Sequence, residues 1–277
     1  LPLAHVEAPT AISVLLAGIL LKLGVYGILR INYGLMPDGV YWFSGALAAL
    51  GLINVVWGGL CALAQTDLKK LVAYSSVNHM GYSLIGMAAI VAAGEANGLN
   101  LKAAQAGLGG AVFQMFNHGT ISAMLFILVG VIYDRAHHRQ IDGFGGLAAQ
   151  MPIYTGITAL AFFAGLGLPG FSGFISEAMC FIGAFPVYRG IVIASTIGIL
   201  LNAAYFLWAF QRIFFGELNE KYTDLPEINR LELFTVVPLL VITLFFGIYP
   251  APYLDIIAST MDVIINHVVT FATYASM

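Results

Sequence analysis

An almost unbroken apolar run covers residues 11–31, and a lysine, Lys22, lies near its middle. Because an α-helix rises about 1.5 Å per residue, a run of this length predicts a helix that crosses a lipid bilayer. An ammonium group at the centre of such a helix costs roughly 3 kcal/mol even on lenient insertion scales. Lysines near helix ends can extend their side chains to the lipid headgroups, but Lys22 lies near the middle of the run. We therefore expect Lys22 to face a partner or a water-filled cavity and to be functional.

Composition extends this argument to the whole chain. Of the 277 residues, 60% are hydrophobic and 9% are charged, whereas soluble domains carry about 25% charged residues. The sequence therefore predicts an integral membrane protein. The net charge of −3 without a basic patch argues against nucleic acid as a partner. Cys61 and Cys180 both lie in apolar runs, which predicts buried thiols rather than a disulfide or a metal site.

Seven apolar segments have the length of a membrane span, which predicts an all-α polytopic fold with seven transmembrane helices and a further C-terminal helix. The seven cover residues 10–31, 41–64, 71–93, 107–133, 152–184, 188–215 and 233–249. The C-terminal stretch 253–274 carries Asp255, Asp262 and His267. It fits an amphipathic surface helix as well as an additional span.

Basic residues in the loops distinguish the two sides of the membrane. With the loops assigned alternately, the first side carries Lys69, Lys70, Arg135, Arg139, Arg212, Lys221 and Arg230, and the second side carries Arg30, Lys102 and Arg189. The positive-inside rule makes the first side cytoplasmic, or its equivalent in an organelle. We therefore expect the C-terminus on the outer side.

The fifth segment is interrupted in its middle by the run Leu-Pro-Gly-Phe-Ser-Gly at residues 168–173. Pro169, together with Gly170 and Gly173, breaks a helix, and the freed backbone groups need partners in protein or water. Transporters build ion sites at such breaks. Glu177 follows the break closely, so we expect two half-helices with this carboxylate beside them. The alternative is a loop that joins two short helices and exposes Glu177 to water.

Two histidines, His79 and His118, lie within other apolar segments. Imidazole titrates near neutral pH and can accept a proton at one nitrogen while donating from the other. Each histidine alone fits a hydrogen-bonded core residue equally well. Together with Lys22 and Glu177, however, they place four ionisable groups on four helices. We expect these groups to converge on one hydrophilic line inside the bundle, with one to three waters between neighbours. No metal-ligand spacing, phosphate-binding motif or nucleophile–base pair accompanies them.

Several longer blocks of sequence carry a family resemblance. They are HVEAPT at 5–10, GILLKLGVYG at 18–27, AQTDLKKLVAYSSVNHMG at 64–81, HG at 118–119, FGGLA at 144–148 and GLPGFSGF at 167–174. With these blocks the chain resembles the antiporter-like subunits of respiratory complex I, most closely those of the subunit 4 type, chain M of the bacterial NADH:quinone oxidoreductase. The resemblance covers nearly the whole chain.

The resemblance implies a fold of fourteen helices with two inverted five-helix repeats, of which this chain would hold helices eight to fourteen. One membrane domain, 1–277, would then comprise a first helix at 10–31, a five-helix repeat at 41–215 and C-terminal helices at 233–274. The chain would be the later part of a longer protein. Lys22 matches the family's central lysine, Glu177 its terminal carboxylate, and His79 and His118 the histidines between them.

The resemblance also implies a function. The chain would help translocate protons across an energy-coupling membrane, most simply the bacterial inner membrane, as one subunit of an NADH:quinone oxidoreductase. FMN, iron-sulfur clusters and quinone would belong to partner subunits, and this chain would hold no cofactor and no metal. A subunit of a multi-subunit sodium/proton antiporter or of a membrane-bound hydrogenase is the alternative with the same fold. A purely structural scaffold subunit is the alternative from another class.

Overall fold

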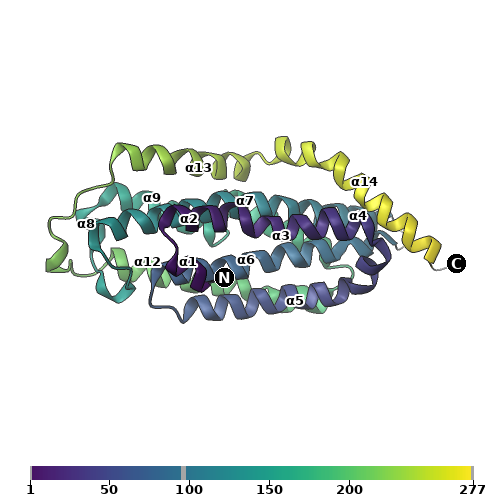
Figure 1. Ribbon diagram of the computed structural model, residues 1–277, viewed down its shortest axis with the longest axis horizontal. Coiled ribbons are helices and arrows are strands. Elements are labelled where there is room, and N and C mark those ends of the chain that lie inside the picture. The colour runs from purple at the N-terminus through teal and green to yellow at the C-terminus, as the bar shows by residue number, and fades with distance from the viewer. Residues whose placement is uncertain (1, 95–97, 276–277) are drawn as a thin grey trace.

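The computed structural model describes residues 2–94 and 98–275, and these residues form helices and loops without a β-strand. Most helices run along the long axis of an elongated bundle (Figure 1). The α-helices outside the first long helix are α1 Pro2–Glu7, α5 Pro37–Leu63, α6 Leu68–Ala88, α7 Gly98–Ala136, α8 Leu147–Gln150, α9 Pro152–Gly165, α10 Ser172–Ala184, α11 Arg189–Ser195, α12 Ile197–Phe214, α13 Arg230–Ile248 and α14 Ala251–Ala275. Short 3₁₀ turns are η3 Ala89–Gly94, η4 Ile141–Gly143 and η5 Glu220–Tyr222.

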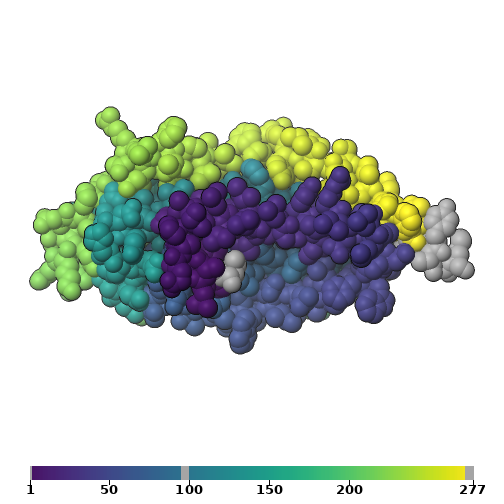
Figure 2. Space-filling model, viewed as in Figure 1, coloured from purple at the N-terminus to yellow at the C-terminus, as the bar shows by residue number. Residues whose placement is uncertain are grey.

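The first long helix alternates between α-helical and π-helical turns. Its successive parts are α2 Thr10–Leu15, η1 Leu16–Leu20, α3 Leu21–Gly27, η2 Ile28–Asn32 and α4 Tyr33–Leu35, of which η1 and η2 are π-helical. Lys22 lies in α3, directly after the first π-helical stretch, and π-bulges often occur at functional sites. Figure 2 shows this helix lying on one face of the bundle, where large apolar side chains such as Ile19 and Leu23 are exposed.

Seven helices among the described residues are long and apolar enough to cross a membrane, so the chain is an integral membrane protein. They are Thr10–Leu35, Pro37–Leu63, Leu68–Gly94, Asn100–Ala136, Arg189–Phe214, Arg230–Ile248 and Ala251–Phe271. The predicted break in the fifth segment is confirmed. Its halves, α9 and α10, contain 14 and 13 residues and are separated by the non-helical residues 166–171.

The two C-terminal helices are arranged end to end rather than side by side (Figure 1). α13 contacts α7, α9 and α10, whereas α14 slants across α5, α7 and η3. Gln105 of α7 donates a hydrogen bond of 2.6 Å to Asp262 of α14, and His267 of α14 lies 3.0 Å from the carbonyl oxygen of Gly34. The polar residues of this stretch therefore fasten α14 to one end of the bundle.

Glycine pairs allow the central helices to approach closely. A Cβ atom added to Gly183 of α10 would lie 2.2 Å from the Cα of Gly107 on α7. Likewise, a Cβ on Gly81 of α6 would lie 2.7 Å from the carbonyl oxygen of Gly51 on α5. Both distances are far below van der Waals contact, so a larger residue requires the helices to separate. The first pair thus sets the spacing of α7 and α10, which carry His118 and Glu177, and the second pair sets the spacing of α5 and α6, which carries His79.

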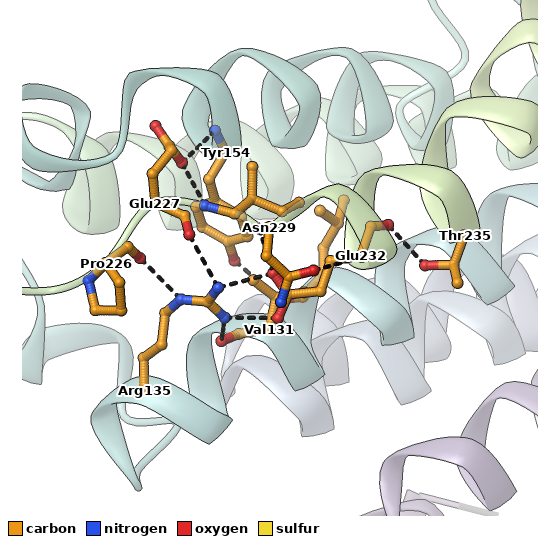
Figure 3. A network of polar contacts seen from close by, with 10 residues as sticks. Val131, Arg135, Tyr154, Pro226, Glu227, Asn229, Glu232 and Thr235 are labelled. Carbon is orange, nitrogen blue, oxygen red and sulfur yellow. Dashed lines mark hydrogen bonds and ion pairs between the residues drawn. The ribbon is translucent and has the colours of Figure 1, made fainter.

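A polar network ties the long loop 215–229 to the end of the bundle (Figure 3). Arg135 of α7 donates to both carboxylate oxygens of Glu232 on α13, at 2.9 and 2.7 Å, and to the loop carbonyl of Glu227 at 3.1 Å. The carboxylate of Glu227 in turn accepts from the backbone N–H groups of Ile153 and Tyr154, at 2.9 and 3.1 Å. It thereby caps the first turn of α9. One loop therefore joins α7, α9 and α13.

Candidate functional site

In the structure Lys22, His118, His79 and Glu177 lie in a series across four helices, each beside the next, and we call this series the line. Nζ of Lys22 lies 2.6 Å from Nδ1 of His118. The rings of His118 and His79 are 5.6 Å apart between centroids. Nδ1 of His79 lies 3.0 Å from Oε1 of Glu177. At each end of the line the two side chains contact each other directly, whereas the sequence analysis expected one to three waters between neighbours.

The lysine end of the line opens into a hollow of about 420 Å³, whose lining includes Lys22, Leu23, Met115 and Tyr253. The lysine itself is half-buried, and its ammonium also donates to the backbone carbonyl of Ala17. Here too a glycine permits a close approach, since a Cβ on Gly119 of α7 would lie 2.9 Å from the carbonyl oxygen of Gly18. This contact lets the lysine reach His118.

The two histidines form the middle of the line, and both are buried, with 4% of His118 and 6% of His79 exposed. Each uses Nδ1 for the contact at its own end, to Lys22 or to Glu177. Nε2 of His118 has no hydrogen-bond partner among the described residues. Each ring therefore has its Nδ1 engaged at one end of the line, and Nε2 of His118 is not used in a hydrogen bond to another described residue.

The carboxylate end of the line lies at the helix break. Glu177, of which 7% is exposed, lies in the second turn of α10. Gly167 and Gly170 have φ angles of 78° and 101°, a region that glycine adopts without strain. A Cβ on Gly167 would lie 3.1 Å from Oε2 of Glu177, so the break also gives the carboxylate room. A hollow of about 340 Å³, lined by the break, Glu177 and Phe181, opens here.

Three polar residues beside the line were missed by the sequence analysis. Gln114 and Asn117 of α7 both contact Ser176 of α10, which directly precedes Glu177. The amide of Asn117 donates to Oγ of Ser176 at 3.0 Å and to the carbonyl oxygen of Ser172 at 2.9 Å. Gln114, Asn117 and Ser176 are all buried. The sequence carried only their nearness to the candidate residues, since Asn117 precedes His118 and Gln114 lies one helical turn before it, and this does not show which helix they contact.

Comparisons with known proteins agree with this architecture. Residues 1–202 match the family described as NADH:quinone oxidoreductase/Mrp antiporter, TM. The NADH-quinone oxidoreductase subunit M of Rhodobacter capsulatus is 43% identical over 262 residues, which are 94% of this chain and 49% of that protein. The chain therefore spans about half the length of this relative.

Solved structures show the same fold. A chain of respiratory complex I from Thermus thermophilus with bound NADH matches with a TM-score of 0.78 at 26% identity, over 89% of this chain and 50% of that chain. A chain of the Mrp complex from Dietzia sp. DQ12-45-1b matches with a TM-score of 0.82 over 97% of this chain and 57% of that chain, and its 20% identity shows likeness of fold alone. The resemblance inferred from the sequence motifs is confirmed, and the chain belongs to the NADH:quinone oxidoreductase/Mrp antiporter transmembrane family.

Proposed function

We propose that this chain translocates protons as part of an antiporter-like subunit of a complex I type NADH:quinone oxidoreductase. The observation that carries the proposal is the line of four titratable side chains, in which both ends are direct contacts of 2.6 and 3.0 Å. Ionisable groups inside a membrane protein are costly to insert, and they mark ion pathways when they cluster. A scaffold subunit has no need of such a line. The name of the relative from Rhodobacter capsulatus supports the type of complex.

The geometry suggests how a proton would move along the line. The ammonium of Lys22 gives its proton to Nδ1 of His118, and the imidazolium then releases the proton on its Nε2. One bridging water would carry it to Nε2 of His79, because no hydrogen bond joins the two rings directly. Nδ1 of His79 then passes a proton to Oε1 of Glu177, which exchanges with the hollow at the helix break. Each imidazole takes up a proton at one nitrogen and releases one from the other.

The remaining parts of the proposal concern the surroundings of the chain. Other membrane subunits of the same assembly would lie beside it, and FMN, iron-sulfur clusters and quinone would lie in partner subunits. This chain would carry out no redox chemistry. The membrane would be a bacterial inner membrane, and the distribution of basic residues in the loops supports a C-terminus on its outer side.

Purification of the complex through a tag on this chain tests the proposal. We expect flavin and iron-sulfur absorbance to co-purify, and NADH oxidation in sealed vesicles to drive proton uptake that does not require sodium. A complex without flavin and iron-sulfur clusters that exchanges sodium for protons would instead assign the chain to a multi-subunit antiporter.

A further inference from the structure

Gln114 lies beside the His79–Glu177 contact and reaches both helices that form it. Its Oε1 accepts a hydrogen bond from the hydroxyl of Ser176, the residue next to Glu177. Its Nε2 makes a long contact of 3.5 Å with the carbonyl oxygen of His79 itself. One amide on α7 therefore links the backbone of α6 at the histidine with α10 beside the glutamate.

Asn117 holds the same turn of α10 from one helical turn further along α7. It donates to the carbonyl oxygen of Ser172 at 2.9 Å and to Oγ of Ser176 at 3.0 Å. Ser172 is the first residue of α10, so this amide holds the helix where it resumes after the break. Without such partners, the first turn of a half-helix is the part most free to shift.

The three side chains are buried and uncharged. Of Gln114, 2% is exposed, and Asn117 and Ser176 are 0% exposed. Amide and hydroxyl groups do not titrate near neutral pH, so this network competes for no proton on the line. We propose that Gln114 and Asn117, acting through Ser176, are positioning residues that hold Glu177 in contact with His79; this rests on the relay proposed above.

The test compares Gln114→Leu with Ser176→Ala in the assembled complex. Leucine occupies a similar space but makes neither hydrogen bond. Alanine at residue 176 removes only the hydroxyl that contacts both amides. If Gln114→Leu does not assemble, Ser176→Ala alone tests the positioning role. The matched control is Gln105→Leu, because Gln105 is also a glutamine of α7 with one interhelical hydrogen bond, to Asp262 on α14.

Two quantities are measured: proton uptake per assembled complex in sealed vesicles, and the infrared band of the Glu177 carboxyl, identified as the band missing from Glu177→Gln. We expect the band to move in both test variants. Uptake should fall about fivefold in Gln114→Leu, which corresponds to about 1 kcal/mol for the lost contacts. Band and uptake should be unchanged in Gln105→Leu.

An unmoved band in both test variants overturns the positioning role, and so does a moved band with wild-type uptake. A fall in uptake without a moved band also overturns it, because the loss then acts elsewhere. Failure of the relay itself gives a different result, since Glu177→Gln would then pump like the wild type whatever Gln114→Leu does.

Discussion

Nδ1 of His79 lies 3.0 Å from Oε1 of Glu177, so that α6 and the second half of the broken helix meet at a titratable pair. Both side chains are less than one tenth exposed. A buried carboxylate is tolerated only with a hydrogen-bonding partner. The pair therefore links helix packing directly to the proposed proton path.

Replacing His79 with asparagine tests the histidine's part in the path. The Asn amide nitrogen falls near the position of Nδ1 and still donates to Glu177, but it cannot take up and release a proton. We expect His79→Asn to assemble and to lose about a hundredfold or more in proton uptake, in line with the usual contribution of one proton-transfer group.

The control for this variant is His137→Asn. His137 is exposed and has a φ angle of 54°, which asparagine also adopts readily. It should pump like the wild type. Equal uptake by His79→Asn and this control would remove His79 from the path.

The glycine contact between α7 and α10 should be intolerant of a single methyl group. In Gly183→Ala the new Cβ would lie 2.2 Å from the Cα of Gly107, and overpacking of this kind costs about 1–3 kcal/mol. We expect less assembled complex on native gels and a lower thermal midpoint. Gly156→Ala on α9 is the control, since nothing lies within 4 Å of its added Cβ. Equal stability of the two variants would show that the helices separate easily.

The network around Arg135 should stabilise the loop at residues 215–229. Arg135→Ala removes a bidentate contact with Glu232 and leaves loop carbonyls without their donor. We expect the free energy of unfolding to fall by about 2 kcal/mol and proteolysis within the loop to become faster. The comparison is Arg212→Ala, whose ion pair with Asp142 is about half exposed on both sides and contributes little. If both variants are cut at the same rate, the network does not hold the loop.

His138 makes a backbone contact in the segment directly after α7 sensitive to acid. Its Nδ1 accepts a hydrogen bond of 3.2 Å from the backbone N–H of Gln140, and its Nε2 contacts the hydroxyl of Tyr222. Burial, and then the charge of Lys221, lower the pKa of His138 below 6.5. The contact with Gln140 is therefore complete above pH 6.5 and is lost as pH falls through the lower pKa of the folded protein.

Hydrogen exchange of the Gln140 amide between pH 7 and pH 5 measures this effect, expressed as a protection factor. In Lys221→Gln the loss of protection should begin at a higher pH, because the cation no longer disfavours protonation. Protection that does not depend on pH, or a midpoint unchanged by this substitution, would contradict the account.

Features of the sequence that break a local rule predicted the site. Lys22 violates the composition of a membrane helix, and Pro169 with its glycines cannot continue one. Gln114, Asn117 and Ser176 break no rule, because small polar groups are cheaper than charges in a membrane helix. Their partners lie on other helices. Only the tertiary structure shows that they converge on α10.

The positions at which helices begin and end were also only partly predictable from the sequence. The apolar run predicted a helix at 107–133, whereas α7 begins at Gly98, because residues such as Lys102 and Gln105 extend it beyond the apolar region. The π-helical turns before and after α3 have no signal in composition. The arrangement of α14 depends on contacts such as Gln105 with Asp262, which lie 157 residues apart in the chain. Periodicity reports local structure and carries no information on such pairs.

Proton uptake by sealed vesicles, normalised to assembled complex, tests the central claim most directly in Glu177→Gln and Glu177→Asp. Glutamine keeps the volume and a hydrogen bond to His79 but cannot ionise. Aspartate keeps the charge with a side chain shorter by one methylene, which a bridging water makes up. The account predicts that the glutamine variant assembles and loses nearly all uptake, while the aspartate variant retains part of it. Wild-type uptake by Glu177→Gln would remove the carboxylate from the path and leave the line of four side chains a structural feature.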